Sequence, residues 1–315
     1  MAKQKPTDFR TSIGGQALIE GVLMRGPEKQ AITVRKPDGE LEVKVEPLKL
    51  VKDRYPILGL PFIRGVVTFL DSMVKGMQAV TDSASFLPED EQEQPGALDR
   101  WIEKHFSSET AEKLIIGVAV VLGILLAVGL FILLPTVLAG LFSKVAPNYL
   151  VRNLLEGVLR IVIFLLYLFL VTRMSDVKRM FAYHGAEHKT IFCYERGLPL
   201  TVENVRPQER FHPRCGTSFL FVVVIVSILV FSVVRWSNVW LRMVFRILLL
   251  PVVVGISYEI NRWVGRHDNV LSSILSWPGK QLQHLTTFEP DDDMIECAIS
   301  SLEAVLPSVQ GADAW

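Results

Sequence analysis

The stretch LIIGVAVVLGILLAVGLFILLPTVLAGLF, residues 114–142, contains 29 residues without a charged side chain. A helix needs about 20 apolar residues to cross the hydrocarbon layer of a membrane, so this stretch predicts a tilted transmembrane helix. Pro135 lies near its end. Because proline lacks the amide proton that helical hydrogen bonding requires, we expect it to kink or end the helix.

Further apolar stretches are also predicted to span a membrane: residues 153–172, 215–234 and 236–258. Glu156 and Arg160 lie one helical turn apart in the first of them, and Arg242 and Arg246 lie near the start of the last. The chain is therefore predicted to be a mainly α-helical, polytopic membrane protein with about four transmembrane helices. These helices form a membrane domain at 114–258 that includes a long loop at 172–218.

The loops predict the orientation of the chain. The loop at 172–218 carries eight Lys or Arg residues, whereas the connections at 143–152 and 235–238 carry two and one. Cytoplasmic loops are enriched in Lys and Arg, so the long loop and both termini are predicted to be cytosolic. We expect a multi-pass protein of the cytoplasmic membrane, with the lipid bilayer as a partner.

The long loop contains Tyr183-His184-Gly185-Ala186-Glu187-His188-Lys189, which has the pattern H-x-x-E-H. In a helix, His184 and His188 lie one turn apart on the same face, where two neutral imidazoles can share a divalent metal. Glu187 lies about 100° round the helix from His188. Its carboxylate is thus beside the metal face, where it can orient a water, accept its proton, or bind the metal. Some metalloproteases carry H-x-x-E-H.

A second cluster, His212-Pro213-Arg214-Cys215, offers an imidazole and a thiol with two residues between them. This spacing suits a tetrahedral zinc site. The candidate metal ligands are therefore His184, His188, His212 and Cys215. In the alternative interpretation, the two helix histidines are solvated near the lipid headgroups, and Cys215 is a small buried apolar residue.

The N-terminal segment, residues 1–56, is expected to be cytosolic. Residues 14–27 contain four glycines and predict an ordered loop packed on the membrane domain. Apolar and polar residues alternate on both sides of Lys36-Pro37-Asp38-Gly39-Glu40. This alternation predicts a small β-hairpin that packs against another part of the protein.

The remaining segments flank the membrane domain. Residues 57–82 predict an amphipathic interfacial helix, because polar residues recur every three or four positions between Pro61 and Val80. Residues 83–113 include the acidic stretch at 88–96 and predict a linker. The C-terminal segment, 259–315, contains a helix expected to begin after Asp291-Asp292-Asp293. Its apolar face needs a partner surface in this chain or another: Met294, Ile295, Ala298, Leu302, Val305 and Leu306.

Composition limits the classes of function. The formal net charge is zero, so no direct nucleic-acid partner is expected. Three cysteines do not form a disulfide framework and fit a reducing compartment. Residues 1–10 are polar and lack the apolar core of a signal peptide, so membrane insertion is expected to use internal segments.

The motifs together resemble the YqhQ-like family of uncharacterised multi-pass bacterial membrane proteins. The resemblance rests on stretches that touch nearly every region of the chain: Gly14–Pro27, Pro61–Gly65, Tyr183–Tyr194, Leu200–Val205, His212–Phe219 and Thr286–Ile295. It implies a protein of the bacterial inner membrane, and it implies metal-dependent enzyme activity, since the family is described in those terms.

Two functions from different classes remain open. In the first, a zinc-dependent hydrolase acts at the cytosolic membrane face, with Glu187 as base, Cys215 or His212 as third ligand, and Glu195 and Glu259 as reserve ligands. In the second, a membrane scaffold or protein-biogenesis factor docks a protein partner on its cytosolic face and carries a structural metal. Transport is a third option that the sequence favours less, because no span is broken by Gly or Pro pairs at its middle.

Overall fold

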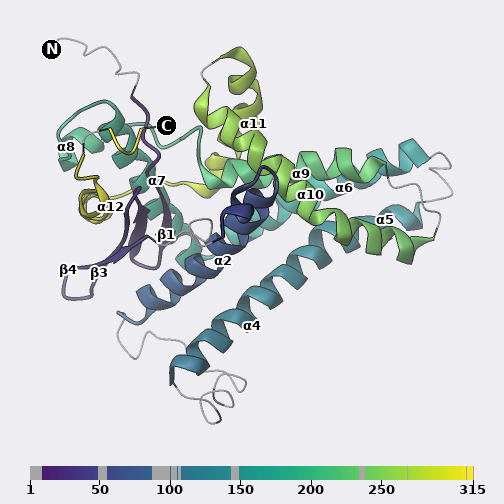
Figure 1. Ribbon diagram of the computed structural model, residues 1–315, viewed down its shortest axis with the longest axis horizontal. Coiled ribbons are helices and arrows are strands. Elements are labelled where there is room, and N and C mark those ends of the chain that lie inside the picture. Colours follow the sequence, from purple (N-terminus) through teal and green to yellow (C-terminus); the bar gives the residue numbers. More distant parts are fainter. Residues whose placement is uncertain are drawn as a thin grey trace.

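The computed structural model describes residues 9–48, 55–86, 100, 105, 108–142, 149–233, 238–267, 269–309 and 311–314. The fold is mainly helical, with a small antiparallel sheet near the N-terminus. In Figure 1 the sheet lies beside α7 (Ser175–Glu195), α8 (Val202–Val205) and α12 (Asp292–Val305), and long apolar helices extend away from it. The acidic stretch at 88–96 in the predicted linker lies outside the described residues.

The sheet contains four strands in the order β1 (Gly14–Leu18), β2 (Gly21–Arg25), β3 (Lys29–Arg35) and β4 (Leu41–Pro47). The predicted hairpin is confirmed as β3 and β4, in which Ile32 pairs with Lys44. The prediction of a glycine-rich loop at 14–27 is wrong, because β1 and β2 form a second hairpin there. A Cβ at Gly21 would lie 2.4 Å from the carbonyl oxygen of Thr33, so this glycine permits close approach between strands.

Both faces of the sheet pack against helices at β2, so this strand lacks the alternation of apolar and polar residues that would identify it. On one face, Val22 and Met24 belong to a core shared with α7 and α12. On the other face, Leu23 and Ile32 pack with Ala79 of α2 (Ile63–Ala84). Strands buried on both faces lack the apolar–polar alternation that identifies half-buried strands. This explains why β2 gives no period-two signal.

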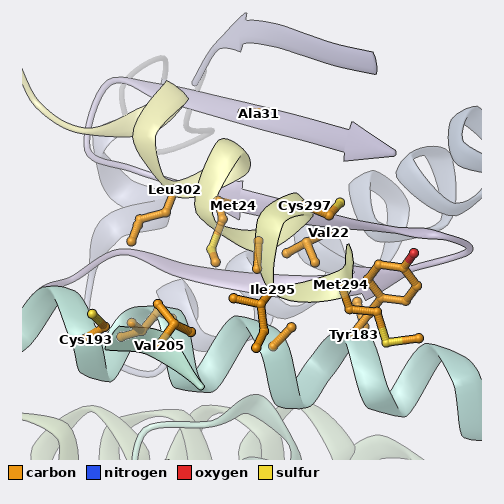
Figure 2. Packing of buried hydrophobic residues seen from close by; sticks show 14 of the residues in the cluster. Val22, Met24, Ala31, Tyr183, Cys193, Val205, Met294, Ile295, Cys297 and Leu302 are labelled. Atoms are coloured by element: carbon orange, nitrogen blue, oxygen red, sulfur yellow. The ribbon is translucent and has the colours of Figure 1, made fainter. Parts of the chain in front are cut away.

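The C-terminal helix is confirmed as α12, and its partner surface lies in the same chain. The Asp291 carboxylate caps the helix by accepting a hydrogen bond from the Met294 amide at 2.9 Å. Figure 2 shows Met294, Ile295 and Leu302 pointing from α12 toward the sheet and α7. The Ser301 hydroxyl adds hydrogen bonds to carbonyls of β2 and β3, each 3.1 Å long. The apolar face of α12 is therefore used within the fold.

Three apolar segments are long enough to cross a membrane: Leu114–Leu141, Val151–Val171 and Trp240–Arg266. They belong to α4 (Ser108–Val128) with η2 (Gly129–Leu133) and α5 (Leu134–Leu141), to α6 (Tyr149–Val171), and to α10 (Val239–Arg266). The predicted fourth span is α9 (Gly216–Ser232), an apolar helix of 17 residues. The prediction of four spans is thus supported for three helices, and α9 begins one residue later and ends two residues earlier than the predicted span at 215–234.

Pro135 neither ends nor breaks the first apolar segment. The π-helical turn η2 precedes it, and the helix continues as α5 with Pro135 in its first turn. The Phe131 carbonyl, four residues earlier, receives no bond from this proline and instead accepts a hydrogen bond of 2.7 Å from Nε of Arg160. Within the bundle, the Glu156 carboxylate accepts hydrogen bonds from Arg160 and Arg246, so the charged residues of the spans meet one another.

Two further helices lie beside the bundle. The predicted helix at 57–82 is present as α2, preceded by the short turn η1 (Pro56–Gly59). Arg64 of α2 forms two hydrogen bonds, 2.8 and 2.5 Å long, with Glu259 of α10, which leaves Glu259 paired away from the histidines. No sequence pattern predicted α11 (Val270–Thr286), whose polar residues Ser272, Ser276 and Gln283 are buried.

Candidate metal centre

Helix α7 brings the two histidines of the H-x-x-E-H pattern together, as predicted. The His184 and His188 rings lie one turn apart, with centroids separated by 4.4 Å. Cys215, the residue that caps the start of α9, approaches the same point from the other cluster. One ligand atom from each of these three residues lies within 4.8 Å of the other two, and all three residues are buried. We call this group the His184–His188–Cys215 triad.

The position of the His184 ring depends on a close contact between α7 and the segment 286–290. A Cβ at Gly185 would lie 2.0 Å from the carbonyl oxygen of Phe288, so only glycine lets the 286–290 segment cross α7 here. The Phe288 amide donates to the Phe181 carbonyl at 2.9 Å and fixes the crossing. The crossing brings the Thr286 carbonyl to the His184 ring.

Backbone carbonyls set the tautomer of both histidines. Nδ1 of His184 lies 2.8 Å from the Thr286 carbonyl oxygen, and Nδ1 of His188 lies 2.5 Å from that of Arg210. A carbonyl oxygen only accepts hydrogen bonds, so each Nδ1 carries a proton; in the neutral imidazole the lone pair is then on Nε2. Nε2 of His184 lies 3.2 Å from Sγ of Cys215. This second-sphere arrangement is the one that metal-bound histidines ordinarily show.

The surroundings of His188 and Cys215 shift their pKa values toward the protonation states in which these side chains bind a metal. Burial lowers the pKa of His188, which keeps the imidazole neutral. Burial raises the pKa of the Cys215 thiol, but positive charge at His188 and hydrogen bonds from the hydroxyl and amide of Thr217 outweigh it; a bound divalent cation would stand in for the charge at His188. The net pKa of Cys215 is therefore below its usual value. Neutral imidazoles and a thiolate are the species that bind zinc, so the triad fits a divalent metal.

Glu187 lies beside the triad but is not one of its three members. Its Oε1 accepts a hydrogen bond of 2.9 Å from the Gly15 amide, and its Oε2 is buried with no partner among the described residues. Burial raises the pKa of Glu187 to about 7, and the hydrogen bond from the Gly15 amide opposes that rise. Strand β1 thus holds one carboxylate oxygen, and the other oxygen stays available for a proton or a ligand.

We expect Gly15→Ala to destabilise the protein, because the new Cβ would lie 2.4 Å from the Leu23 carbonyl and 3.1 Å from Cδ of Glu187. Such overpacking costs about 2 kcal/mol. Gly14→Ala is the matched control in the same strand, since a Cβ there meets nothing within 4 Å. Unfolding curves of the two purified variants provide the measurement. Equal stabilities would contradict this close approach.

His212, the fourth predicted ligand, lies next to the triad but outside it. Its ring centroid is 5.5 Å from that of His188. Its Nε2 lies 3.8 Å from the Glu195 carboxylate, which also accepts a hydrogen bond from Arg214. Gln283 of α11 bonds both the amide and the carbonyl of His212, at 2.7 and 2.8 Å. His212 and the reserve ligand Glu195 therefore interact with each other beside the centre.

The residues that support the triad were mostly invisible in the sequence. The Thr286 and Arg210 carbonyls act through the backbone, so their side chains give no signal. Gln283 and Lys189 do act through side chains: Lys189 is buried, donates to the Arg206 carbonyl at 2.8 Å and pairs with Glu289. Lys189 directly follows the H-x-x-E-H pattern, and this position is the feature of the sequence that could have identified it as a supporting residue.

Comparison with known proteins identifies the family and no activity. A family model described as a protein of unknown function (DUF1385) matches residues 60–308. The chain is 33% identical over 296 residues to an uncharacterised protein, YqhQ, of Bacillus subtilis (strain 168), with 93% of this chain and 92% of that protein covered. No solved structure matches the chain. The family resemblance inferred from the motifs is therefore confirmed, and the chain belongs to the DUF1385 family.

Proposed function

We propose that this protein is a membrane-bound, zinc-dependent hydrolase whose metal is held by the His184–His188–Cys215 triad. The observation that carries the proposal is the state of the donor atoms. Both Nδ1 protons are committed to carbonyls, so both Nε2 lone pairs are free to face the Cys215 thiol. Two nitrogens and one sulfur form a donor set that zinc accepts, and three protein ligands leave a fourth position for water.

Glu187 is the residue proposed to move the proton. A zinc ion bound at the triad would supply Lewis acidity, which lowers the pKa of a coordinated water. Glu187 is held through Oε1 by the Gly15 amide, and its unpartnered Oε2 is the atom that would accept the proton. Its burial and its position next to His188 make this carboxylate the group suited to accept and return a proton at the site.

The proposed reaction takes place at the cytosolic surface of the membrane. Cys215 caps the first turn of the apolar helix α9, so the triad lies at one end of the bundle. The eight basic residues of the loop at 172–218 favour the cytosol for that end. Reporter fusions test this topology: fusions at Ser237 and Trp315 should lie on opposite sides of the membrane. Fusions on the same side would contradict it.

A structural metal in a membrane scaffold is the second candidate function. The observation that favours it is burial: His184 is 9%, His188 1% and Cys215 6% exposed. A closed zinc site stabilises a fold without binding substrate. Under this alternative the metal would join the start of α9 to α7. Docking of a protein partner through α12 receives no support, because its apolar face is occupied by the sheet.

Metal analysis of the purified protein tests what both candidates share. Under reducing, chelator-free conditions we expect about one zinc ion per chain, as for a single tetrahedral site. A well-folded wild-type protein without bound metal would contradict both.

A further inference from the structure

A cavity of about 340 Å³ lies next to the candidate metal centre and is not part of it. Its walls come from residues 9 and 10, the end of α7, the 209–214 segment, the end of α10 and α11 from Ser272 to Lys280. Glu195 and Arg214 in the wall contact His212, whose ring is 5.5 Å from that of His188. Its volume is within the range of small-molecule sites.

The cavity carries an excess of positive charge. Its charged lining residues, His267 apart, are four basic and two acidic: Arg10, Arg196, Arg214, Lys280, Glu195 and Glu209. Arg214 is bonded to Glu195, and Arg196 is bonded to Gln208 and lies 4.0 Å from Glu209. The two acids are thus already matched by two arginines. Ser273 of α11 adds a hydroxyl group to the lining, whereas the Ser272 and Ser276 hydroxyls donate to the carbonyls of Asn269 and Ser273. Cationic groups and hydroxyls favour a phosphate-bearing anion.

Helix α11 has the polarity of a helix that faces lipid. Its first half buries Ser272 and Ser276 and exposes four apolar residues, each more than half exposed: Val270, Leu271, Ile274 and Trp277. The exposed polar residues of the helix are Ser273, Gln281 and His284. A water-facing helix shows the opposite arrangement, with polar residues outside. Figure 1 shows α11 projecting beside the junction between the sheet and the apolar helices. The apolar face therefore lies on the helix that lines the cationic cavity.

We propose that this cavity binds the phosphate-bearing headgroup of an anionic membrane lipid, whose acyl chains lie against the exposed face of α11. The charge excess matches the phosphate, and the face containing Ile274 and Trp277 matches the chains. The inference goes beyond the proposed hydrolase, because binding a headgroup here requires no metal.

Lipid binding to the detergent-purified, full-length protein tests the inference, with native mass spectrometry as the readout. Phosphatidylglycerol should bind at least about tenfold more tightly than phosphatidylcholine, which corresponds to about 1.4 kcal/mol. Lys280→Glu should abolish this preference, and Lys280→Arg should retain it. Lys36→Glu, a charge reversal at the distant β3–β4 turn, is the matched control and should bind like wild type. Circular dichroism verifies that each variant is folded.

Each outcome decides the question. Equal binding of the two lipids, or an unchanged preference in Lys280→Glu, would overturn the proposal. Displacement of phosphatidylglycerol by an equal concentration of glycerol phosphate would assign the cavity to a soluble anion and also overturn it. Chelator-treated protein should keep the lipid preference. A protein that binds no metal but keeps this preference would refute the hydrolase and leave the lipid site standing.

Discussion

His188→Ala is expected to remove the metal from the protein and to lower its stability. His188 supplies one of three converging donor atoms, and its Nδ1 proton is committed to the Arg210 carbonyl. The loss of a direct ligand should weaken metal binding by more than about 100-fold, the upper end of the loss seen when supporting residues are removed. The free energy of metal binding contributes to folding, so thermal stability should fall as well. Metal content and a melting curve provide the measurements.

His212→Gln is the matched control for this prediction. His212 is a buried histidine in the same loop, but its Nε2 faces Glu195 and Arg214, and it is not one of the three residues whose ligand atoms converge. The variant should therefore keep its metal even if it is less stable. Metal loss in His212→Gln, together with metal retention in His188→Ala, would contradict the ligand set. The parallel variants His184→Ala and Cys215→Ser should behave like His188→Ala.

Glu187→Gln is expected to abolish function while leaving metal content and fold intact. Glutamine keeps an oxygen that can accept the Gly15 hydrogen bond, but it replaces the unpartnered Oε2 with an amide that accepts no proton. Loss of a general base typically costs about 10² to 10⁴ in rate. Complementation of a strain that lacks the gene measures function, and metal analysis of the purified variant measures the site.

Glu203→Gln provides the comparison, since Glu203 is an exposed glutamate on α8 and should be replaceable without effect. If Glu187→Gln complements as well as wild type while His188→Ala does not, the metal is structural and the hydrolase proposal fails. If Glu187→Gln loses the metal too, Glu187 is a ligand and not a base. The three patterns distinguish the two candidate functions from each other and from a four-ligand site.

Local periodicity predicted a substantial part of this fold. The spacing of His184 and His188 sufficed to place both rings on one face of α7, and the helix was found. Gly197 follows the last turn of that helix and adopts a positive φ of 65°, as expected of a glycine just after a helix end. The apolar face of α12 and the β3–β4 hairpin also follow from short-range patterns.

The parts that escaped prediction depend on contacts between distant segments. Strands β1 and β2 were missed because Val22 and Leu23 are buried on opposite faces, which removes the alternation. The orientation of His212 was equally hidden. Its two-residue spacing from Cys215 suits a shared metal, but Gln283, 71 positions away, fixes its backbone and Arg214 contacts its ring. Sequence spacing limits how near two side chains can come and does not set where they point.

The absorption spectrum of the cobalt-substituted protein tests the central claim most directly, because Co²⁺ reports both geometry and thiolate ligation where Zn²⁺ is silent. The triad predicts the spectrum of a four-coordinate ion with one sulfur ligand. The thiolate charge-transfer band should disappear in Cys215→Ser and persist in His212→Gln. A folded wild-type protein that binds no Co²⁺, or a thiolate band that survives in Cys215→Ser, would contradict the assignment of His184, His188 and Cys215 as a metal site.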